Sequence, residues 1–372
     1  MERAKEASRQ ELLEVISGFD FGGELEEVGI FGNGHINETY CAVFSTDTGK
    51  KKFILQKMNH QIFKDPVGLM ENISGVTSWL KKKIQENGGD VERETLNIVN
   101  DREGSPYLVD KEGEYWRAYL FIEGATCFDQ VENDEDFYQS ALAFGNFQRL
   151  LSDYPAETLH ETIPDFHNTV KRFGDFKKAV AEDACGRAAD VQKEIQFVLE
   201  REQLAHTLVD LQKAGKLPLR VTHNDTKLNN IMIDDVTHKG ICVIDLDTVM
   251  PGLSLNDFGD SIRFGASTAA EDEQDISKVS CDLLLFEVYV KGFLEGCGGA
   301  LTDLEVEMLP MGAILMTFEC GMRFLADHLE GDHYFRIHRE NHNLDRARTQ
   351  FKLVWDMEQK LSEMKAIVQK YK

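Results

Sequence analysis

The sequence predicts an α+β chain built as two lobes, a small β-rich N-terminal lobe and a larger, mainly helical C-terminal lobe. Two observations lead to this fold class. Alternating apolar runs separated by turn residues fill the first third of the chain, whereas apolar residues at helical spacing fill most of the remainder. The change falls at Gly124, so we expect one lobe over residues 1–123 and the other over residues 124–372.

The first lobe is expected to hold an antiparallel sheet and one helix. Its first three strands form a meander, because the turn residues of "GNG" and "TDTGK" separate them. Val67, Met70 and Ile73 recur at helical spacing after this meander and predict a helix within residues 65–83. The predicted strands lie within residues 25–34, 36–47, 51–59, 105–110 and 114–124.

Helices are expected over most of the second lobe. In the first of them Phe137, Ala141 and Phe144 recur every three or four positions, after acidic residues placed where a helix dipole favours them. Two short strands, "NIMID" and "GICVID", interrupt the helices and predict a β-hairpin. The helical patterns lie within residues 134–154, 188–214, 275–296, 303–330 and 343–371.

Composition favours small molecules as binding partners. The 41 Lys and Arg residues against 65 Asp and Glu residues give a net charge of −24, which disfavours nucleic acid and anionic membranes. The seven cysteines are scattered without the spacing of a zinc site, and no apolar run approaches the length of a membrane span. We therefore expect reduced thiols in a cytoplasmic protein.

The stretch "VTHNDTKLNNIMIDDVTHKGICVIDLDTV", residues 221–249, gathers polar side chains around the predicted hairpin. If its two strands pair, Asn230 and Asp245 lie close together and offer the hard oxygen donors that Mg²⁺ prefers. Asp225 would then accept the proton of an attacking hydroxyl, and Lys227 would reach the transferring phosphoryl group. Alternatively, these residues simply cap a turn and end a strand.

Two motifs in this stretch resemble those of a known superfamily. "HNDTKLNN" is similar to the catalytic loop of the protein-kinase-like superfamily, and "VIDLDTV" resembles the metal-binding segment of its aminoglycoside phosphotransferase and choline kinase branch. The resemblance implies a two-lobed protein-kinase-like fold that uses ATP and Mg²⁺ in a cleft between the lobes. It favours Asp245 over Asp257 of the later "DFG" as the metal ligand, and assigns Asp257 to bracing the catalytic loop. Asp247 could face either the metal or solvent.

The same resemblance directs attention to "FGNGHINETY" in the first lobe. There Gly32 and Gly34 would let backbone amides approach the phosphates of ATP. A Gly-Asn-Gly turn is also common in ordinary hairpins. The motif therefore indicates a phosphate-binding loop mainly because it precedes the catalytic-loop motif in the sequence.

Two further segments of the first lobe would contact the nucleotide. The family carries a strand lysine for the phosphates, and "KKFILQKMN" offers Lys57 in one alignment and Gln56, a departure from the family pattern, in the other. In "YLFIEG", backbone groups between Phe121 and Glu123 would meet adenine.

The match extends along nearly the whole chain to the N-acetylhexosamine 1-kinases, through motifs such as "GHINETY", "IDLDTVMPG" and "ECGMRFLADHLEGDHYF". It implies phosphorylation of the anomeric hydroxyl of N-acetylglucosamine and N-acetylgalactosamine, with Asp225 as the base and with Arg323 and Tyr334 holding the sugar. Glu319 and Arg323 could equally form an ordinary helix ion pair. His167 is a further candidate that could also be a plain loop residue.

Two alternative functions stay open on the sequence. The chain could be a kinase of the same fold for another small alcohol, such as a different sugar, homoserine or choline. It could also be a pseudokinase that binds nucleotide without catalysis, although Asp225, Asn230 and Asp245 are all present.

Overall fold

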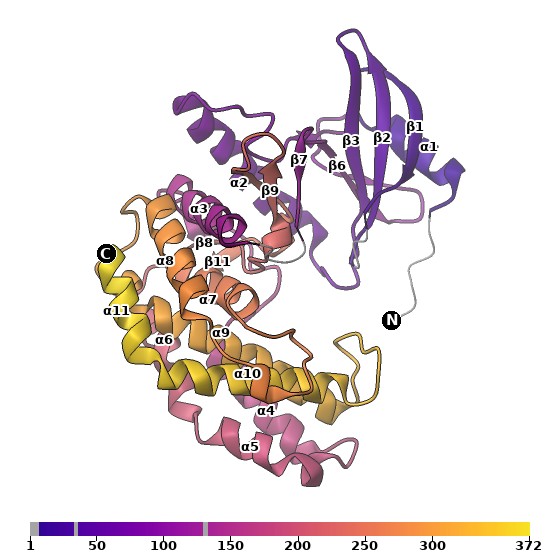
Figure 1. The fold of residues 1–372 in the computed structure, drawn as a ribbon. Helices are drawn as coiled ribbons and strands as arrows, with labels where there is room; N and C mark the ends of the chain where they lie inside the picture. Colours follow the sequence, from indigo (N-terminus) through magenta and orange to yellow (C-terminus); the bar gives the residue numbers. More distant parts are fainter. Residues whose placement is uncertain (1–6, 33–35, 129–132) are drawn as a thin grey trace.

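The computed structural model describes residues 7–32, 36–128 and 133–372 of the chain. A sheet-rich N-terminal lobe stands apart from a helical C-terminal lobe, with α2, β7 and β9 between them (Figure 1). The large sheet is antiparallel in the order β1-β2-β3-β6-β4, with β5 also paired to β6. Its strands are β1 (Glu24–Ile30), β2 (Glu38–Thr46), β3 (Gly49–Lys57), β4 (Ile98–Val99), β5 (Leu108–Val109) and β6 (Tyr115–Leu120).

The β1–β2–β3 meander confirms the predicted order of the first strands. The structure also contains α1 (Arg9–Gly18), a helix that the sequence analysis missed. Ser8 caps it in a capping box with Glu11, and its buried Leu12, Val15 and Ile16 pack with apolar residues of the sheet. The described residues of this lobe therefore contain two helices where one was predicted.

The predicted second helix is α2 (Pro66–Glu86), which begins after the capping residue Asp65. Its apolar face does not pack on the sheet alone. Ile73 and Val76 share one buried cluster with Tyr119 of β6 and with Leu246 near the predicted metal-binding segment. This helix therefore supplies much of the apolar contact that joins the two lobes.

The helical lobe surrounds one long central helix. Among the described residues, this helix is the one long and apolar enough to cross a membrane, but 78% of its most apolar window is buried inside the protein. The helices are α3 (Asp134–Leu150), α4 (Thr169–Glu182), α5 (Gln192–Leu199), α6 (Glu202–Lys213), α7 (Ser254–Gly265), α8 (Leu283–Cys297), the central α9 (Asp303–Glu330), α10 (His342–Gln359) and α11 (Leu361–Tyr371).

Short strands carry the chain between the lobes and into the predicted catalytic loop. The predicted hairpin is confirmed as β9 (Ile231–Asp234) with β10 (Gly240–Val243), and β7 (Ala125–Thr126) adds to its edge. In the other small sheet β8 (Arg220–Thr222) pairs with β11 (Met250–Gly252). Because β6 belongs to the large sheet and β7 to the small one, we propose to keep the lobe boundary between residues 123 and 124.

A close helix crossing places α7 against α9. A Cβ atom at Gly259 would lie 2.3 Å from the Gly312 carbonyl oxygen, and one at Gly312 would lie 2.5 Å from the Leu255 carbonyl oxygen, so both positions depend on the absence of a side chain. The crossing presents Asp257 and Asp260 of α7 to the catalytic loop. Glu319 and Arg323 of α9 lie about two and about three helical turns beyond Gly312.

Candidate active site

A buried aspartate in α7 holds the loop that contains Asp225. The Asp257 carboxylate accepts hydrogen bonds from the backbone N–H groups of His223 and Asn224, at 2.9 and 2.8 Å, and from the Gln148 side chain at 2.8 Å. Asp257 is 1% exposed, so water does not compete for these bonds. The bracing role predicted for Asp257 is confirmed.

Hydrogen bonds also tie together the two segments that carry the predicted catalytic and metal-binding residues. His223 Nε2 lies 2.8 Å from the Ile244 carbonyl oxygen, and Asn224 Nδ2 donates to the Thr248 carbonyl at 2.8 Å. Asn224 and Asp245 have left-handed backbone conformations, with φ of 64° and 57°. Such conformations are uncommon outside glycine and gather at functional sites, where surrounding contacts hold them.

The Asp225 carboxylate lies between a cation and an amide. Lys227 Nζ is 2.8 Å from one carboxylate oxygen, and Asn230 Nδ2 lies 3.3 Å from the other and donates to the Asp225 carbonyl at 2.7 Å. Burial lowers the pKa of Lys227, but the attraction of Asp225 outweighs it and holds this pKa above its ordinary value. The structure thus brings these three residues together, with the lysine charged.

Asp245 lies just after β10, beside the end of the catalytic loop. The Ile244 N–H donates to the Asn230 carbonyl at 2.9 Å, which brings the two predicted metal ligands side by side along the backbone. The Asp245 side chain reaches solvent. Partial loss of surrounding water, followed by repulsion from Asp247 and Asp225, raises the pKa of Asp245 to about 6.

The donors of this site fit Mg²⁺ better than a structural metal. A divalent cation would relieve the repulsion around Asp245, and the bond from the Asn230 amide nitrogen to Asp225 leaves the amide oxygen to face a cation. In residues 7–32, 36–128 and 133–372 no group of three or more His, Cys, Asp or Glu side chains is arranged to hold a metal. Mg²⁺ needs no such group, because phosphate oxygens and waters complete its coordination.

Asp247 turns away from solvent and meets the N-terminal lobe. It is 5% exposed and accepts hydrogen bonds from Arg117 Nη1 of β6 and, at 2.7 Å, from Asn37 Nδ2 in the segment just before β2. No sequence pattern indicates Arg117, because 130 positions separate it from Asp247 and no short motif relates them. The packing of the two lobes against each other brings them together.

Lys57, predicted to contact phosphates, lies on the face of the sheet opposite to that of Arg117. In the β3–β6 register Gln56 is opposite Arg117 and Lys57 is opposite Trp116. The Gln56 side chain accordingly bonds Arg117, whereas the Lys57 ammonium lies 5.7 Å from the centre of a Trp116 ring and 3.4 Å from a Glu11 oxygen. The structure does not bring Lys57 to the Asp225 loop, and we propose Gln56 as the β3 residue on the phosphate side.

The predicted glycine loop joins β1 to β2. Gly34 lies outside the described residues. Gly32 is exposed and has a φ of 73°, a conformation that suits glycine. The preceding residue, Phe31, packs edge-on against Phe121 with ring centres 5.6 Å apart. The loop therefore starts beside the segment predicted to meet adenine.

The segment from Phe121 to Glu123 is held from both sides. The Phe121 N–H donates to the Lys52 carbonyl at 3.0 Å, and the Glu123 carbonyl accepts from Arg93 Nη2 at 3.0 Å. Arg93 also binds Asp234 of β9 at 2.8 Å, so it connects this segment to the helical lobe. Any adenine contact would therefore use the other peptide groups of the segment.

The structure brings the two predicted sugar-binding residues together. Arg323 Nη2 lies 3.3 Å from the Tyr334 hydroxyl. Its guanidinium lies over three aromatic rings, with distances to the ring centres of 5.6 Å for Phe166, 5.5 Å for Tyr334 and 5.4 Å for Phe335. These contacts hold the arginine without a carboxylate partner in the described part of the chain.

His167 connects this aromatic group to the catalytic loop. Its Nδ1 lies 2.9 Å from Glu319 Oε1, and its Nε2 lies 3.4 Å from the Asn224 carbonyl oxygen. The alternative of a Glu319–Arg323 ion pair is therefore wrong for the described residues, because Glu319 pairs with His167 and Arg323 with aromatic rings. His167 and Phe166 are neighbours in sequence, so Arg323 lies close to the loop that carries Asp225.

Asp327 anchors the segment that carries Tyr334. Its carboxylate accepts hydrogen bonds from the backbone N–H groups of His333, Tyr334 and Phe335, at 2.9, 2.8 and 2.9 Å, and from Asn343 Nδ2 at 2.9 Å. The sequence analysis missed this residue. A carboxylate on the last turn of a helix, before glycine and aromatic residues, was the available signal.

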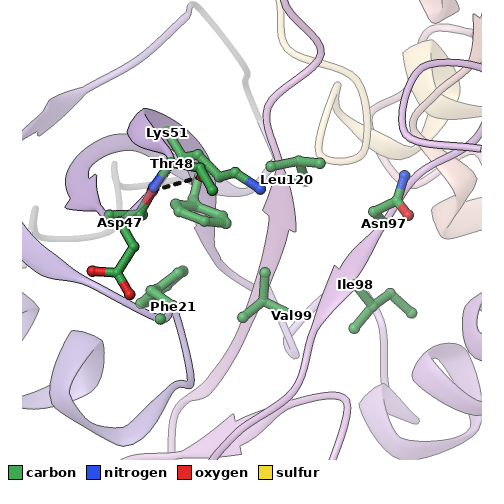
Figure 2. Close-up of a pocket in the computed structure, with 11 residues that line it drawn as sticks. Phe21, Asp47, Thr48, Lys51, Asn97, Ile98, Val99 and Leu120 are labelled. Atoms are coloured by element: carbon green, nitrogen blue, oxygen red, sulfur yellow. Dashed lines mark hydrogen bonds between the residues drawn. The ribbon is translucent and has the colours of Figure 1, made fainter.

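Two surface hollows of the described protein differ in their position relative to the predicted site. One, of about 410 Å³, is lined by Lys51 and Phe53 of β3, which point to the opposite face from Gln56, and none of the predicted site residues lines it (Figure 2). The other, of about 550 Å³, is lined in part by Phe166 and Asn224, next to Asp225. The second hollow is therefore the one that borders the catalytic loop.

Comparisons with known proteins agree with this architecture. An aminoglycoside phosphotransferase from Alicyclobacillus acidocaldarius subsp. acidocaldarius DSM 446 is 11% identical, with a TM-score of 0.62 and 99% of each chain covered. A spectinomycin phosphotransferase in complex with ADP and spectinomycin is 15% identical, with a TM-score of 0.56 over 95% of this chain and 100% of that chain. A choline kinase from Cryptosporidium parvum Iowa II is 14% identical, with a TM-score of 0.56 over 91% of this chain and 90% of that chain.

These likenesses define the class of the protein as a kinase-like fold, which confirms the predicted α+β, two-lobed architecture. The chain also matches the model of the phosphotransferase enzyme family over residues 32–279, more than half of its length. The chain belongs to this family and is a phosphotransferase.

Proposed function

We propose that the chain is an ATP- and Mg²⁺-dependent kinase that phosphorylates the anomeric hydroxyl of N-acetylglucosamine or N-acetylgalactosamine. The observation that carries the proposal is the connection of the Asp225 loop to the Arg323 aromatic group through Phe166 and His167. This connection supports the proposal, because it brings the proposed base Asp225 near polar and aromatic groups that suit a neutral, hydroxyl-rich ring.

In the proposed reaction each residue of the loop has one task. Asp225 accepts the proton of the attacking anomeric hydroxyl. Lys227, which holds Asp225 at 2.8 Å, offers its positive charge to the phosphoryl group as it transfers. Mg²⁺, when bound by Asn230 and Asp245, neutralises charge on the phosphates.

The proposed nucleotide contacts lie on the N-terminal lobe. We assign Gly32 and Gly34 to the phosphates and the peptide groups between Phe121 and Glu123 to adenine. The ADP complex of a spectinomycin phosphotransferase with this fold supports nucleotide use. The cytoplasmic location stays a prediction from the composition.

The charge on the acceptor side supports a neutral acceptor. The Arg323 guanidinium would repel choline or a polycationic aminoglycoside, but it can donate hydrogen bonds to sugar hydroxyl and acetamide oxygens. Tyr334 is 66% exposed, so its ring and hydroxyl are available to a bound sugar. Arg323 and Tyr334 are therefore the proposed sugar-binding pair.

The test is ADP release from MgATP with N-acetylglucosamine, N-acetylgalactosamine, choline and homoserine as separate acceptors. Asp225→Asn removes the proposed base, and Asp235→Asn is the matched control, because Asp235 is an exposed residue of the hairpin turn. We expect release with the N-acetylhexosamines that Asp225→Asn abolishes and Asp235→Asn retains, and ³¹P NMR should show the phosphate on the anomeric carbon.

Release with choline or homoserine alone would contradict the sugar assignment and favour a sister kinase. Nucleotide binding without release for any acceptor would favour the pseudokinase.

A further inference from the structure

A buried arginine in the N-terminal sheet faces the helical lobe. Arg117 is 2% exposed. Its Nε donates to Gln56 Oε1 at 2.9 Å, and Gln56 Nε2 in turn donates to Thr39 Oγ1 of β2 at 3.1 Å. Two neighbouring strands thus fix the plane of the guanidinium, while its terminal Nη1 points to Asp247 of the other lobe.

A contribution to folding stability does not by itself explain why a charged residue is buried at position 117. Desolvating two ions costs about as much as their attraction returns, and well-packed apolar residues are often as stable or more so. Burial lowers the pKa of Arg117, but Asp247, Tyr119 and Asp245 outweigh it and hold the pKa above its ordinary value. The group is therefore a permanent buried cation placed beside the predicted metal-binding segment.

Few cations in the described part of the chain reach this segment. Asp247 of this segment pairs with Arg117, and Asp225 of the neighbouring catalytic loop pairs with Lys227. In the described residues Arg117 is the cation that the N-terminal lobe supplies to Asp247, beside the neutral amide of Asn37. A nucleotide triphosphate brings several negative charges to this place, and phosphoryl transfer depends on neutralising them.

We infer that Arg117 is the residue through which the N-terminal sheet binds the phosphates of the nucleotide, an inference that rests on the proposed function. A planar guanidinium matches phosphate oxygens with paired N–H groups. In the described residues the structure shows hydrogen bonds from Nε and Nη1 only, so further N–H groups remain for phosphate. Asp247 holds the cation in the nucleotide-free protein.

The experiment compares ligands that differ only in phosphate. Binding of ATP, ADP and adenosine is measured by calorimetry, with Mg²⁺ present throughout, for the wild type, Arg117→Met and Arg117→Lys. Arg220→Met is the matched control, because Arg220 also forms an ion pair largely shielded from solvent, with Glu305 at 2.6 Å and a side chain that is 9% exposed, but lies outside the site. Thermal unfolding of each variant is recorded alongside.

We expect Arg117→Met to weaken ATP and ADP binding about 10- to 100-fold, because it removes a charge-assisted hydrogen bond to a phosphate. Adenosine has no phosphate, so its affinity should stay the same. Arg117→Lys should lose less, because it keeps the charge without the paired geometry, and it provides the test if the Met variant fails to fold. Arg220→Met should bind all three ligands as the wild type does.

An equal loss of ATP and adenosine affinity, or no loss of either in the folded variants, would overturn the inference and leave Arg117 as a structural link between the lobes. Wild-type protein that binds no MgATP would contradict the proposed function itself, and the inference with it.

Discussion

The catalytic loop and the phosphate side of the N-terminal sheet are built in opposite ways. In the loop, residues within the single stretch 221–249 bond one another and the brace Asp257. On the sheet, Asn37, Gln56 and Arg117 come from separate segments and meet because β2, β3 and β6 pair. Residues that contact one another within a short segment can be recognised as a sequence motif. Residues that meet only through the register of a sheet cannot.

The largest expected effect lies in the loop. Asp225→Asn should lower kcat by at least about 1,000-fold, because an amide of the same size cannot accept the proton. The unfolding free energy should change by less than about 1 kcal/mol, because the pair with Lys227 is partly exposed. Steady-state kinetics and urea unfolding measure the two quantities. A variant with wild-type kcat would show that the loop is not the reaction centre.

The next effect tests how far the loop depends on its brace. Asp257→Asn places an amide N–H₂ where a carboxylate oxygen accepts backbone N–H groups, and it should lower the free energy of unfolding by about 2–3 kcal/mol. Urea denaturation against Asp235→Asn, the exposed control, measures it. Unchanged stability would mean that the loop holds its shape without α7.

A smaller effect concerns pH. In EDTA, the folded chain binds the Asp245 proton more tightly than the unfolded chain, because the pKa rises from near 4 to about 6. The stability contribution is therefore present below the unfolded pKa and is lost as pH rises to 6. Since the side chain reaches solvent, we expect about 1 kcal/mol between about pH 4.5 and about pH 7.

The measurement for this prediction is the free energy of unfolding of the wild type relative to Asp245→Asn across that pH range. The advantage of the wild type should shrink toward neutral pH. A difference that stays constant would show that the carboxylates of this segment do not repel one another in the metal-free protein.

The smallest expected effect sharpens the assignment of strand faces. Lys57→Met should change the affinity for MgATP by no more than about twofold, because the Lys57 ammonium faces Trp116 and Glu11 and not the helical lobe. Its partly exposed ion pair should contribute less than ~1 kcal/mol to folding stability. Calorimetry of both proteins provides the comparison. A large loss of affinity would restore Lys57 to the phosphate side and remove Gln56 from it.

Sequence patterns predicted the elements well where periodicity was long and regular. The patterns over 134–154 and 303–330 became α3 and α9, and the hairpin became β9 and β10. Two helical patterns proved to be pairs of helices, with breaks at residues 200–201 and at Lys360, because side-chain periodicity continues across a short interruption. Periodicity also failed to predict the partner of Glu319. The helical spacing suggested Arg323, but in the folded protein Glu319 pairs with His167.

The sequence by itself determined the α+β architecture and the loop with Asp225 and Asn230, because the groups that make these features are close in the chain or repeat at a fixed period. The brace Asp257 was predicted only through the superfamily resemblance, since 34 positions separate it from His223. Only the tertiary structure decided which face of β3 meets the helical lobe. On that face Gln56 bonds Arg117, and Arg117 in turn bonds Asp247, whereas Lys57 lies on the opposite face. The physical reason is that a shift of one residue in strand register moves every side chain to the opposite face.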